Sequence, residues 1–364
     1  MMRRAARWLS PVLICVGLLS GPGATCAAAA DDAPRKRAVT TPLPQLPAPD
    51  ERTERQSRPA AQTYLSFPQW LLVYGPNELA RHLEHQRADS FPFMRYVGRY
   101  WGAYWTVWRA SSDQPLDVGY HAMLIANGVS ISVEYALRAA HEALFGQLTG
   151  WLASERTAED RFAAQVAREY VDFIRLRPWY EFDFSDALRR LWEDVPDEPG
   201  GAGRLRHWER RWLLSSEYGL KAAYASVIAK ATGWAGTPES PDTQVVVDRV
   251  PADLAGIAPT ARRQDAARLL LPRYQPFTTA AVALARRGVN FREIAGNGGT
   301  ILVSVLADDR WIPANPGALL VLRQNDLAEP GRKRMLLAVS IARLGEALRG
   351  WQANGAAIEH IYDF

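Results

Sequence analysis

The sequence has very few cysteines and lysines. Its two cysteines, Cys15 and Cys26, both lie in the first thirty residues, so the rest of the chain has no thiol for a disulfide, a nucleophile or a metal site. The formal net charge is +4, and three arginines in residues 1–30 account for most of it. The remainder is therefore close to neutral, without the positive field that nucleic acid requires, and we expect no nucleic-acid partner.

The sequence also lacks the common catalytic motifs. It contains no Gly-x-Ser-x-Gly, no His-Glu-x-x-His, no phosphate-binding loop and no dinucleotide fingerprint. Among its six histidines, His82 and His85 flank Glu84 on a polar stretch, and His360 belongs to the last apolar segment. We interpret these three histidines as solvent-exposed. We therefore predict no catalytic residue, no bound metal and no cofactor.

No apolar run reaches the length of about 20 residues that spans a bilayer. The longest apolar run near the N-terminus, "LSPVLICVGLLSG", follows Arg3, Arg4 and Arg7 and precedes "ATCAAAADD". A basic start, a short apolar run and a small-residue zone are typical of a secretory signal peptide. We predict a signal peptide over 1–30 and a periplasmic or otherwise exported protein. The alternative is an uncleaved segment that holds the protein to the membrane.

Composition divides the rest of the chain into four parts. The stretch 31–62 is rich in proline and charge and poor in large apolar side chains, which predicts a disordered tether. Residues 63–235 show helical periodicity. The segment "GTPESPDTQ" indicates a linker over 236–249, and residues 250–364 combine strand and helix patterns.

The helical part contains an internal repeat. The windows 133–151 and 216–234 share eight of nineteen residues, including the Glu-Tyr pair near the start and the final Thr-Gly-Trp. Each window ends a longer unit, 91–151 or 177–234, that consists of a helix, a loop and a long helix. We predict a duplicated helical hairpin whose two long helices pack against each other through small residues.

The repeated helices carry the candidate binding site. Glu and a cation stand four residues apart on both helices, the spacing of a helical ion pair. If the two pairs converge, they could hold a ligand; otherwise they are surface pairs. A di-metal site is less expected, because it would also need Glu-x-x-His motifs. The candidate ligand-binding residues are Glu134, Tyr135, Arg138, Glu217, Tyr218 and Lys221.

An aromatic helix is the second candidate site. The segment "FPFMRYVGRYWGAYWTVW" combines tyrosine and tryptophan with arginine, a composition that suits the membrane interface. Most helices of this composition belong to a core, and the alternatives to a core are a membrane-interface contact and a stacking surface for glycan or lipid. The candidate membrane or partner contacts are Tyr100, Trp101, Tyr104, Trp105 and Trp108.

The C-terminal part is predicted to be a small α+β sandwich. "VNFREIA" and "TILVSVL" flank "GNGG" and are interpreted as a hairpin. "KRMLLAV" leads into a helix that begins after Ser340 and ends at Gly355, and "AAIEHIYDF" is the final strand. Such a strand–helix–strand unit joins parallel strands. The fold class is therefore α+β, with a mainly helical N-terminal domain and a ferredoxin-like C-terminal sandwich.

Two classes of function are consistent with these features. The first is a non-catalytic binding, assembly or lipid-handling module of the cell envelope, with envelope lipid, glycan or an envelope protein as partner and peripheral membrane contact. The second is an enzyme with an unfamiliar carboxylate site around Glu134 and Glu217. The lack of a common catalytic motif favours the first class.

Overall fold

A computed structural model describes most of the chain after residue 59. The described residues are 60–153, 155–197, 203–235, 242–251, 259–263, 266–313 and 317–362. The predicted signal peptide over 1–30 and nearly all of the predicted tether over 31–62 lie outside these residues. The described part is 61% helical and contains two antiparallel sheets, so the chain is an α+β protein.

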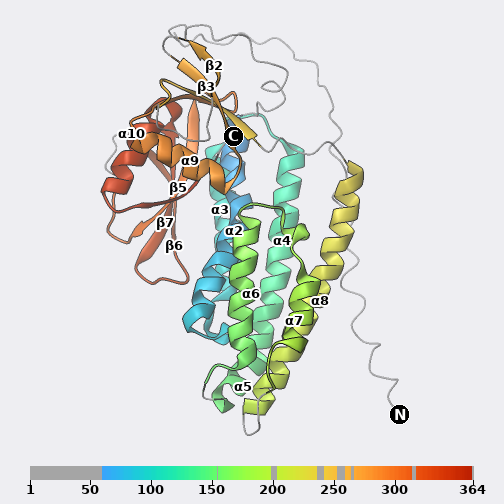
Figure 1. The fold of residues 1–364 in the computed structure, drawn as a ribbon. Helices are drawn as coiled ribbons and strands as arrows, with labels where there is room; N and C mark the ends of the chain where they lie inside the picture. Colours follow the sequence, from blue (N-terminus) through green and yellow to red (C-terminus); the bar gives the residue numbers. More distant parts are fainter. Residues whose placement is uncertain are drawn as a thin grey trace.

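The N-terminal half is a bundle of long helices that lies beside the two sheets (Figure 1). Its segments are α2 (Ala60–His85), η1 (Ala88–Ser90), α3 (Phe93–Ala110), α4 (Val118–His141), the π-helical turn η2 (Glu142–Gly146), α5 (Gln147–Leu152), α6 (Ala158–Ile174), η3 (Trp179–Glu181), α7 (Phe184–Glu193) and α8 (Gly203–Ala235). Among the described helices, none is both long and apolar enough to cross a membrane.

Local sequence signals explain where several of these helices begin. Thr157 and Asp160 form the capping box at the start of α6, with each side chain bonded to the other residue's backbone N–H. Asp117 accepts a hydrogen bond from the backbone N–H of Tyr120 at the start of α4. These caps satisfy backbone donors that the first helical turn leaves without a partner.

The C-terminal half contains two four-stranded sheets. Its elements are β1 (Asp242–Val247), β2 (Pro259–Arg263), β3 (Ala266–Pro272), α9 (Gln275–Arg286), β4 (Phe291–Ile294), β5 (Thr300–Asp308), β6 (Leu319–Asn325), β7 (Arg332–Ser340), α10 (Ile341–Ala353) and β8 (Ala357–Ile361). The strand orders are β2-β3-β1-β4 and β6-β7-β5-β8. Strand β1 lies within the segment 236–249 that we expected to be a linker, and it pairs with both β3 and β4.

Each sheet is built from the same order of elements: three strands, a helix and a fourth strand. In the first sheet Val245 pairs with Leu269 and Ile294. In the second sheet Val303 pairs in the same way, with one residue of β7 and one of β8. The register also shifts at matching places, after Val246 in β1 and after Ser304 in β5. The two sheets therefore share one β-β-β-α-β topology.

This topology corrects part of our sequence interpretation. A ferredoxin-like unit has the order β-α-β-β-α-β, which differs from the order in both sheets. The predicted hairpin is also wrong, because β4 and β5 belong to different sheets. The predicted strand–helix–strand unit is present: β7 and β8 both pair antiparallel with β5, so they are parallel to each other.

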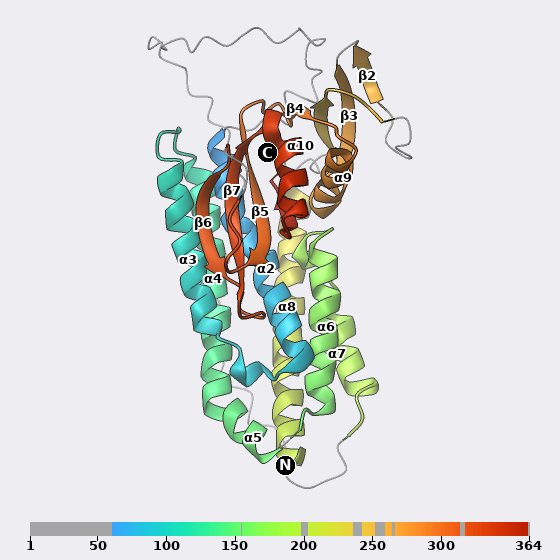
Figure 2. The same ribbon diagram turned by 90° about the vertical axis from the view of Figure 1, so that its left-hand side faces the viewer.

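Two cores meet at the second sheet. Its inner face packs with α9, α10 and the first sheet around residues such as Trp351. Its outer face packs against α2 and α3, where Leu302, Leu336 and Tyr362 join the helical core (Figure 2). Because both faces are covered, β5 and β7 are buried along almost their whole length. The helical and sheet halves therefore share a core.

Two of the three histidines that we interpreted as exposed are buried. His360 stacks on Trp70 with the ring centroids 3.4 Å apart, and burial lowers its pKa well below the ordinary value. His82 contacts Ser90 at 3.0 Å and packs edge-on against Phe91. His85 is exposed, as predicted. His360 is covered by a segment distant in sequence, and His82 is covered by the turn that follows its own helix.

Candidate functional site

The structure brings together the four charged residues predicted from the repeat. Glu134 and Arg138 of α4 lie 3.1 Å apart, and Lys221 and Glu217 of α8 lie 2.9 Å apart. Across the helices, Lys221 lies 3.1 Å from Glu134, and Arg138 is ion-paired with Glu217. We call these four residues the charge square. Positive and negative groups alternate around it, so each carboxylate contacts both cations.

The charge square keeps both carboxylates ionised. Burial would raise the pKa of Glu217, but Arg138 and Lys221 outweigh that effect and lower the pKa to about 2. The pKa of Glu134 is also lowered, because Lys221 and Arg138 together overcome its burial. A catalytic carboxyl group usually has a pKa near the working pH. This arrangement therefore favours a clamp between two helices over a site for proton transfer.

The two tyrosines of the repeat are core residues. Tyr135 packs against Phe93 and Tyr96 with ring centroids 5.6 and 5.1 Å apart. Tyr218 packs in a separate core against Phe162 of α6. Burial raises the pKa of both phenol groups. Because both rings are covered, they support the charge square from inside and present no surface to a ligand.

Helices α4 and α8 do not meet through the small residues that we expected to pack together. Gly150 lies against Arg87 and Asp89 of the turn before α3, and Gly219 faces Leu188 of α7. Long charged side chains bridge α4 and α8 instead. Glu134 pairs with Lys221, and Arg138, which is later in α4, pairs with Glu217, which is earlier in α8. The two helices are therefore antiparallel.

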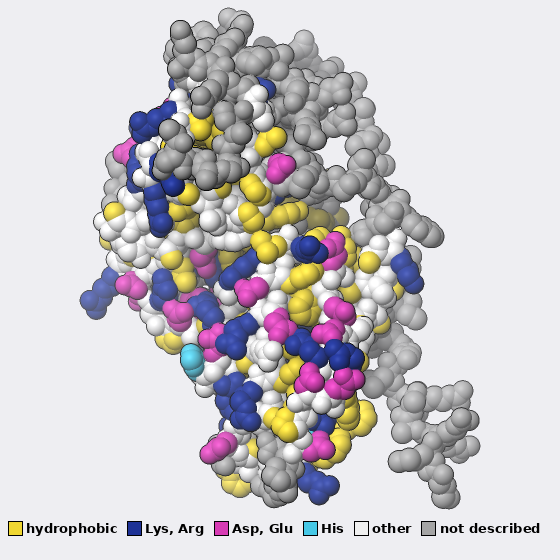
Figure 3. Space-filling view, in the orientation of Figure 1, with side chains coloured by type: hydrophobic (Ala, Val, Ile, Leu, Met, Phe, Trp, Pro, Cys, Tyr) yellow, Lys and Arg dark blue, Asp and Glu magenta, His cyan; other side chains and the backbone are white. Residues whose placement is uncertain are grey.

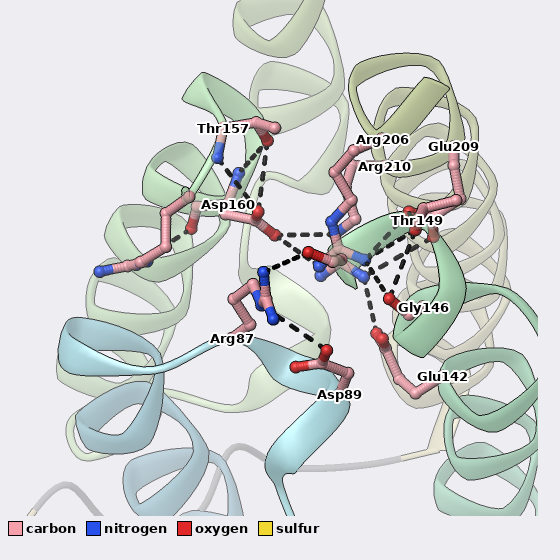
Figure 4. A network of polar contacts seen from close by, with 12 residues as sticks. Arg87, Asp89, Glu142, Gly146, Thr149, Thr157, Asp160, Arg206, Glu209 and Arg210 are labelled. Atoms are coloured by element: carbon pink, nitrogen blue, oxygen red, sulfur yellow. Dashed lines mark hydrogen bonds and ion pairs between the residues drawn. The ribbon is translucent and has the colours of Figure 1, made fainter. Parts of the chain in front are cut away.

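Near the lower end of these helices in Figure 1 the bridging charges are almost fully buried. Arg206 and Arg210 of α8 each lie 3.1 Å from Asp160 of α6. Arg210 also lies 2.6 Å from Glu142, and Arg206 donates to the carbonyl oxygen of Gly146, both in the π-helical turn (Figure 4). We call these residues the buried charge network. It joins three helices, and removing one partner would leave a charge without compensation.

The aromatic helix α3 is mostly core. Tyr100 is buried and donates to the carbonyl oxygen of Leu124, and Tyr104 is buried against His121. These two tyrosines therefore cannot form the predicted contact surface. Trp101 and Trp108 are partly buried, and Trp101 donates to Ser132. Of the five candidates only Trp105 is exposed, at 49%.

The sequence interpretation missed an exposed uncharged face on the repeated helices. From Ala122 to Trp151, every exposed residue except Gln147 is apolar, and none is charged. On α4, η2 and α5 these residues are Ala122, Met123, Ile125, Ala126, Val129, Val133, Ala136, Leu137, Ala140, Ala143, Leu144, Phe145, Gln147, Leu148 and Trp151. On α8 the exposed residues from 205 to 227 are Leu205, Trp208, Trp212, Ser216, Leu220, Ala223, Ser226 and Val227. We call these two sets the uncharged face.

Helix α7 presents charged side chains to water, unlike the uncharged face. On α7, Arg189 pairs with Asp186 and Glu193 at 2.5 Å, and all three side chains are exposed. Figure 3 shows basic and acidic side chains interspersed with hydrophobic ones over the helical part of the visible face. The sequence does contain a signal for the uncharged face: between Val118 and Trp151 the charged residues are few and fall on one side of the helix.

The fold and this site define a mainly helical α+β protein with a charge-clamped pair of antiparallel helices. No protein-family model, curated protein or solved structure matches the chain. Within the described ranges, no group of three or more acidic, histidine or cysteine side chains is arranged to hold a metal ion.

Proposed function

We propose that this protein is a non-catalytic binding or assembly module of the cell envelope and that it contacts its partner through the uncharged face. The observation that carries the proposal is the run from Ala122 to Trp151, where no charged residue is exposed as a whole and the half-exposed carboxylate of Glu134 is paired with Arg138 and Lys221. At about 1.5 Å per residue this run extends over about 45 Å. Contiguous apolar patches of this size on a protein mark interaction surfaces.

The individual exposures are large. Leu137, Leu144 and Trp151 are 65%, 68% and 78% exposed, although each is a side chain that folding normally removes from water. Covering apolar surface contributes about 25 cal/mol per Å², so a partner that covers these three side chains gains several kcal/mol. A partner with an apolar surface of similar length would therefore bind favourably.

The charge square and the buried charge network give this face its rigidity. The charge square joins α4 to α8, and the buried charge network joins α8 to η2 and α6, so the helices that carry the uncharged face are fixed to each other by ion pairs. A fixed pair of helices loses little conformational entropy on binding, which preserves the free energy gained from contact. The repeated Glu and cation residues therefore do not contact the partner. They hold the helices that carry the uncharged face in a fixed position.

A duplication of the helical hairpin accounts for this symmetrical design. Phe93 begins α3, and its ring centroid lies 5.0 Å from that of Phe91. Phe184 begins α7, 91 residues later, and its ring centroid lies 4.9 Å from that of Phe182. Helix α3 has 18 residues and α7 has 10. That difference accounts for the shorter offset of 83 residues between Glu134 and Glu217. A two-fold exchange of the two hairpins would map the charge square onto itself.

The enzyme alternative receives less support from the same residues. Glu134 and Glu217 share two cations and have lowered pKa values, so neither is poised to donate a proton near neutral pH. The part of the proposal that concerns export to the envelope is based on the sequence of residues 1–30. It enters the proposal because that segment has the order of charge, apolar run and small residues expected of a signal peptide.

Photo-crosslinking in the producing cell tests the proposed function. A photoreactive amino acid replaces Leu137 on the uncharged face, or Ala342, which is exposed on α10. We expect a discrete adduct from position 137 and none from position 342. Equal adducts at both positions, or none at either, would contradict the proposal. Circular dichroism and the melting temperature show whether each variant keeps the fold.

A further inference from the structure

The uncharged face also indicates what kind of partner covers it. Its middle row, on α4 and the start of η2, consists of residues with small or short side chains spaced alternately four and three residues apart, the spacing of a left-handed helix pair. The row is Ala122, Ala126, Val129, Val133, Ala136, Ala140 and Ala143, and all seven are exposed. Larger exposed side chains, among them Ile125, Leu137 and Leu144, stand beside the row.

This arrangement is complementary to itself. Small side chains allow two helix backbones to approach closely. When two copies of α4 cross, the larger side chains beside one row fit over the small side chains of the other. In a symmetric dimer the same patch serves both subunits, so it must be self-complementary. The uncharged face meets that requirement because it contains no charge that would face its own copy.

The charges of α4 argue against an anionic membrane as the occupant. From Val129 to Trp151 the acidic and basic side chains are Glu134, Arg138, His141 and Glu142, and all four are ion-paired with α8. Surface-bound amphipathic helices instead present lysine or arginine to lipid headgroups beside the apolar stripe. Between Ala122 and Trp151 this face offers no exposed cation.

The size of the face fits a stable dimer. Two exposed helix surfaces about 45 and 35 Å long and about 10 Å wide give on the order of 800 Å². A standard protein–protein interface buries about 800 Å² on each partner. Homodimer interfaces are also more apolar than other contacts, and charged residues are depleted at their centre.

We propose that the uncharged face binds a second copy of this chain, with a two-fold axis that crosses α4 between Ala122 and Ala140. This inference rests on the proposed function, because it names the partner for the same face. Packing of α4 against its copy would form the centre of the dimer, and the exposed tryptophans of α8 would lie toward its rim.

Analytical ultracentrifugation of the purified protein tests this inference. We expect a species of twice the mass of the purified chain for the parent. Ala136→Arg with Ala140→Arg should weaken self-association by about 100-fold or more, because uncompensated charges would enter the interface. Since both sites are exposed in the single chain, the helical content measured by circular dichroism should not change. Ala342→Arg, a matched change on α10, should leave the dimer intact.

Cysteine crosslinking gives an independent readout. In a chain with Cys15→Ser and Cys26→Ser, single cysteines replace Ala122, Val129, Ala136 or Ala143 in turn. A residue near a two-fold axis forms a disulfide with its own copy when the Cα atoms lie within about 7 Å. We expect at least one of the four variants to form a disulfide-linked dimer on mild oxidation and Ala342→Cys to form none.

The two proposals fail in different ways. A parent protein that stays monomeric at micromolar concentration, or a double-arginine variant that still dimerises, would overturn the second copy as partner. If the photoreactive group at position 137 then forms an adduct with another protein or a lipid, the proposed binding function stands and only the dimer is rejected. No adduct and no dimer would reject both.

Discussion

Helices α3 and α4 lie side by side and have opposite relations to water. Helix α3 has the aromatic composition of a contact surface, yet Tyr100 and Tyr104 are among the most buried residues of the protein. Helix α4 has an apolar stripe that would suit a core, yet Ile125 and Leu137 are exposed. An amphipathic pattern shows which side of a helix is apolar. Neighbouring elements decide whether that side is covered.

The largest expected effect is on the covered helix. Tyr100→Ala should lower the free energy of unfolding by about 3–5 kcal/mol, because it opens a cavity in the core shared with the second sheet. Chemical denaturation measures the change. Tyr100→Phe is the matched control and should cost about 1 kcal/mol, the value of the hydrogen bond to Leu124. If the alanine variant costs less than the phenylalanine variant, Tyr100 is not a core residue.

The charge square should have an intermediate effect. Its side chains are about one-fifth exposed, apart from Glu134 at 40%, so it lies between surface and buried pairs. Glu217→Gln should cost about 1–2 kcal/mol, above the 0–1 of exposed pairs and below the 3–5 of buried ones. A double-mutant cycle with Arg138→Met isolates the coupling. No coupling between the two sites would mean that the pair does not form.

The same group predicts how stability depends on pH. The pKa of Glu217 is lowered from 4.5 to about 2 on folding, so the unfolded chain binds a proton first as the pH falls. The stabilisation is present above about pH 4.5 and should be lost progressively between about pH 4.5 and 2. Denaturation curves measured at several pH values across that range give the free energy of unfolding. This free energy should fall more steeply with decreasing pH for the parent than for Glu217→Gln. Equal slopes would contradict the assignment.

The smallest effect on stability is expected on the uncovered helix. Leu137→Gln should change the free energy of unfolding of the isolated chain by less than about 0.5 kcal/mol, because a 65% exposed side chain loses little packing. Leu124→Gln, on the buried side of the same helix, is the control and should be strongly destabilising. Similar losses for both variants would show that α4 is covered on both sides.

Sequence patterns predicted some parts of this molecule and missed others. The four residues of the charge square were visible as a local spacing, because helix geometry places residues four apart on one side. The hairpin between β4 and β5 was wrong because alternation and a glycine-rich turn describe a strand and not its sheet. The prediction that His360 is exposed was wrong because nothing near it in sequence reveals Trp70, which covers it.

The sequence by itself determined the helical and mixed halves, the repeat with its paired charges, and the absence of thiol chemistry after Cys26. These depend on local periodicity and on residue type, which a single chain displays directly. Only the tertiary structure decided that α3 is covered by α4 and the second sheet while α4 leaves its apolar side in water. Burial depends on contacts between segments far apart in the chain, and no local pattern specifies those contacts.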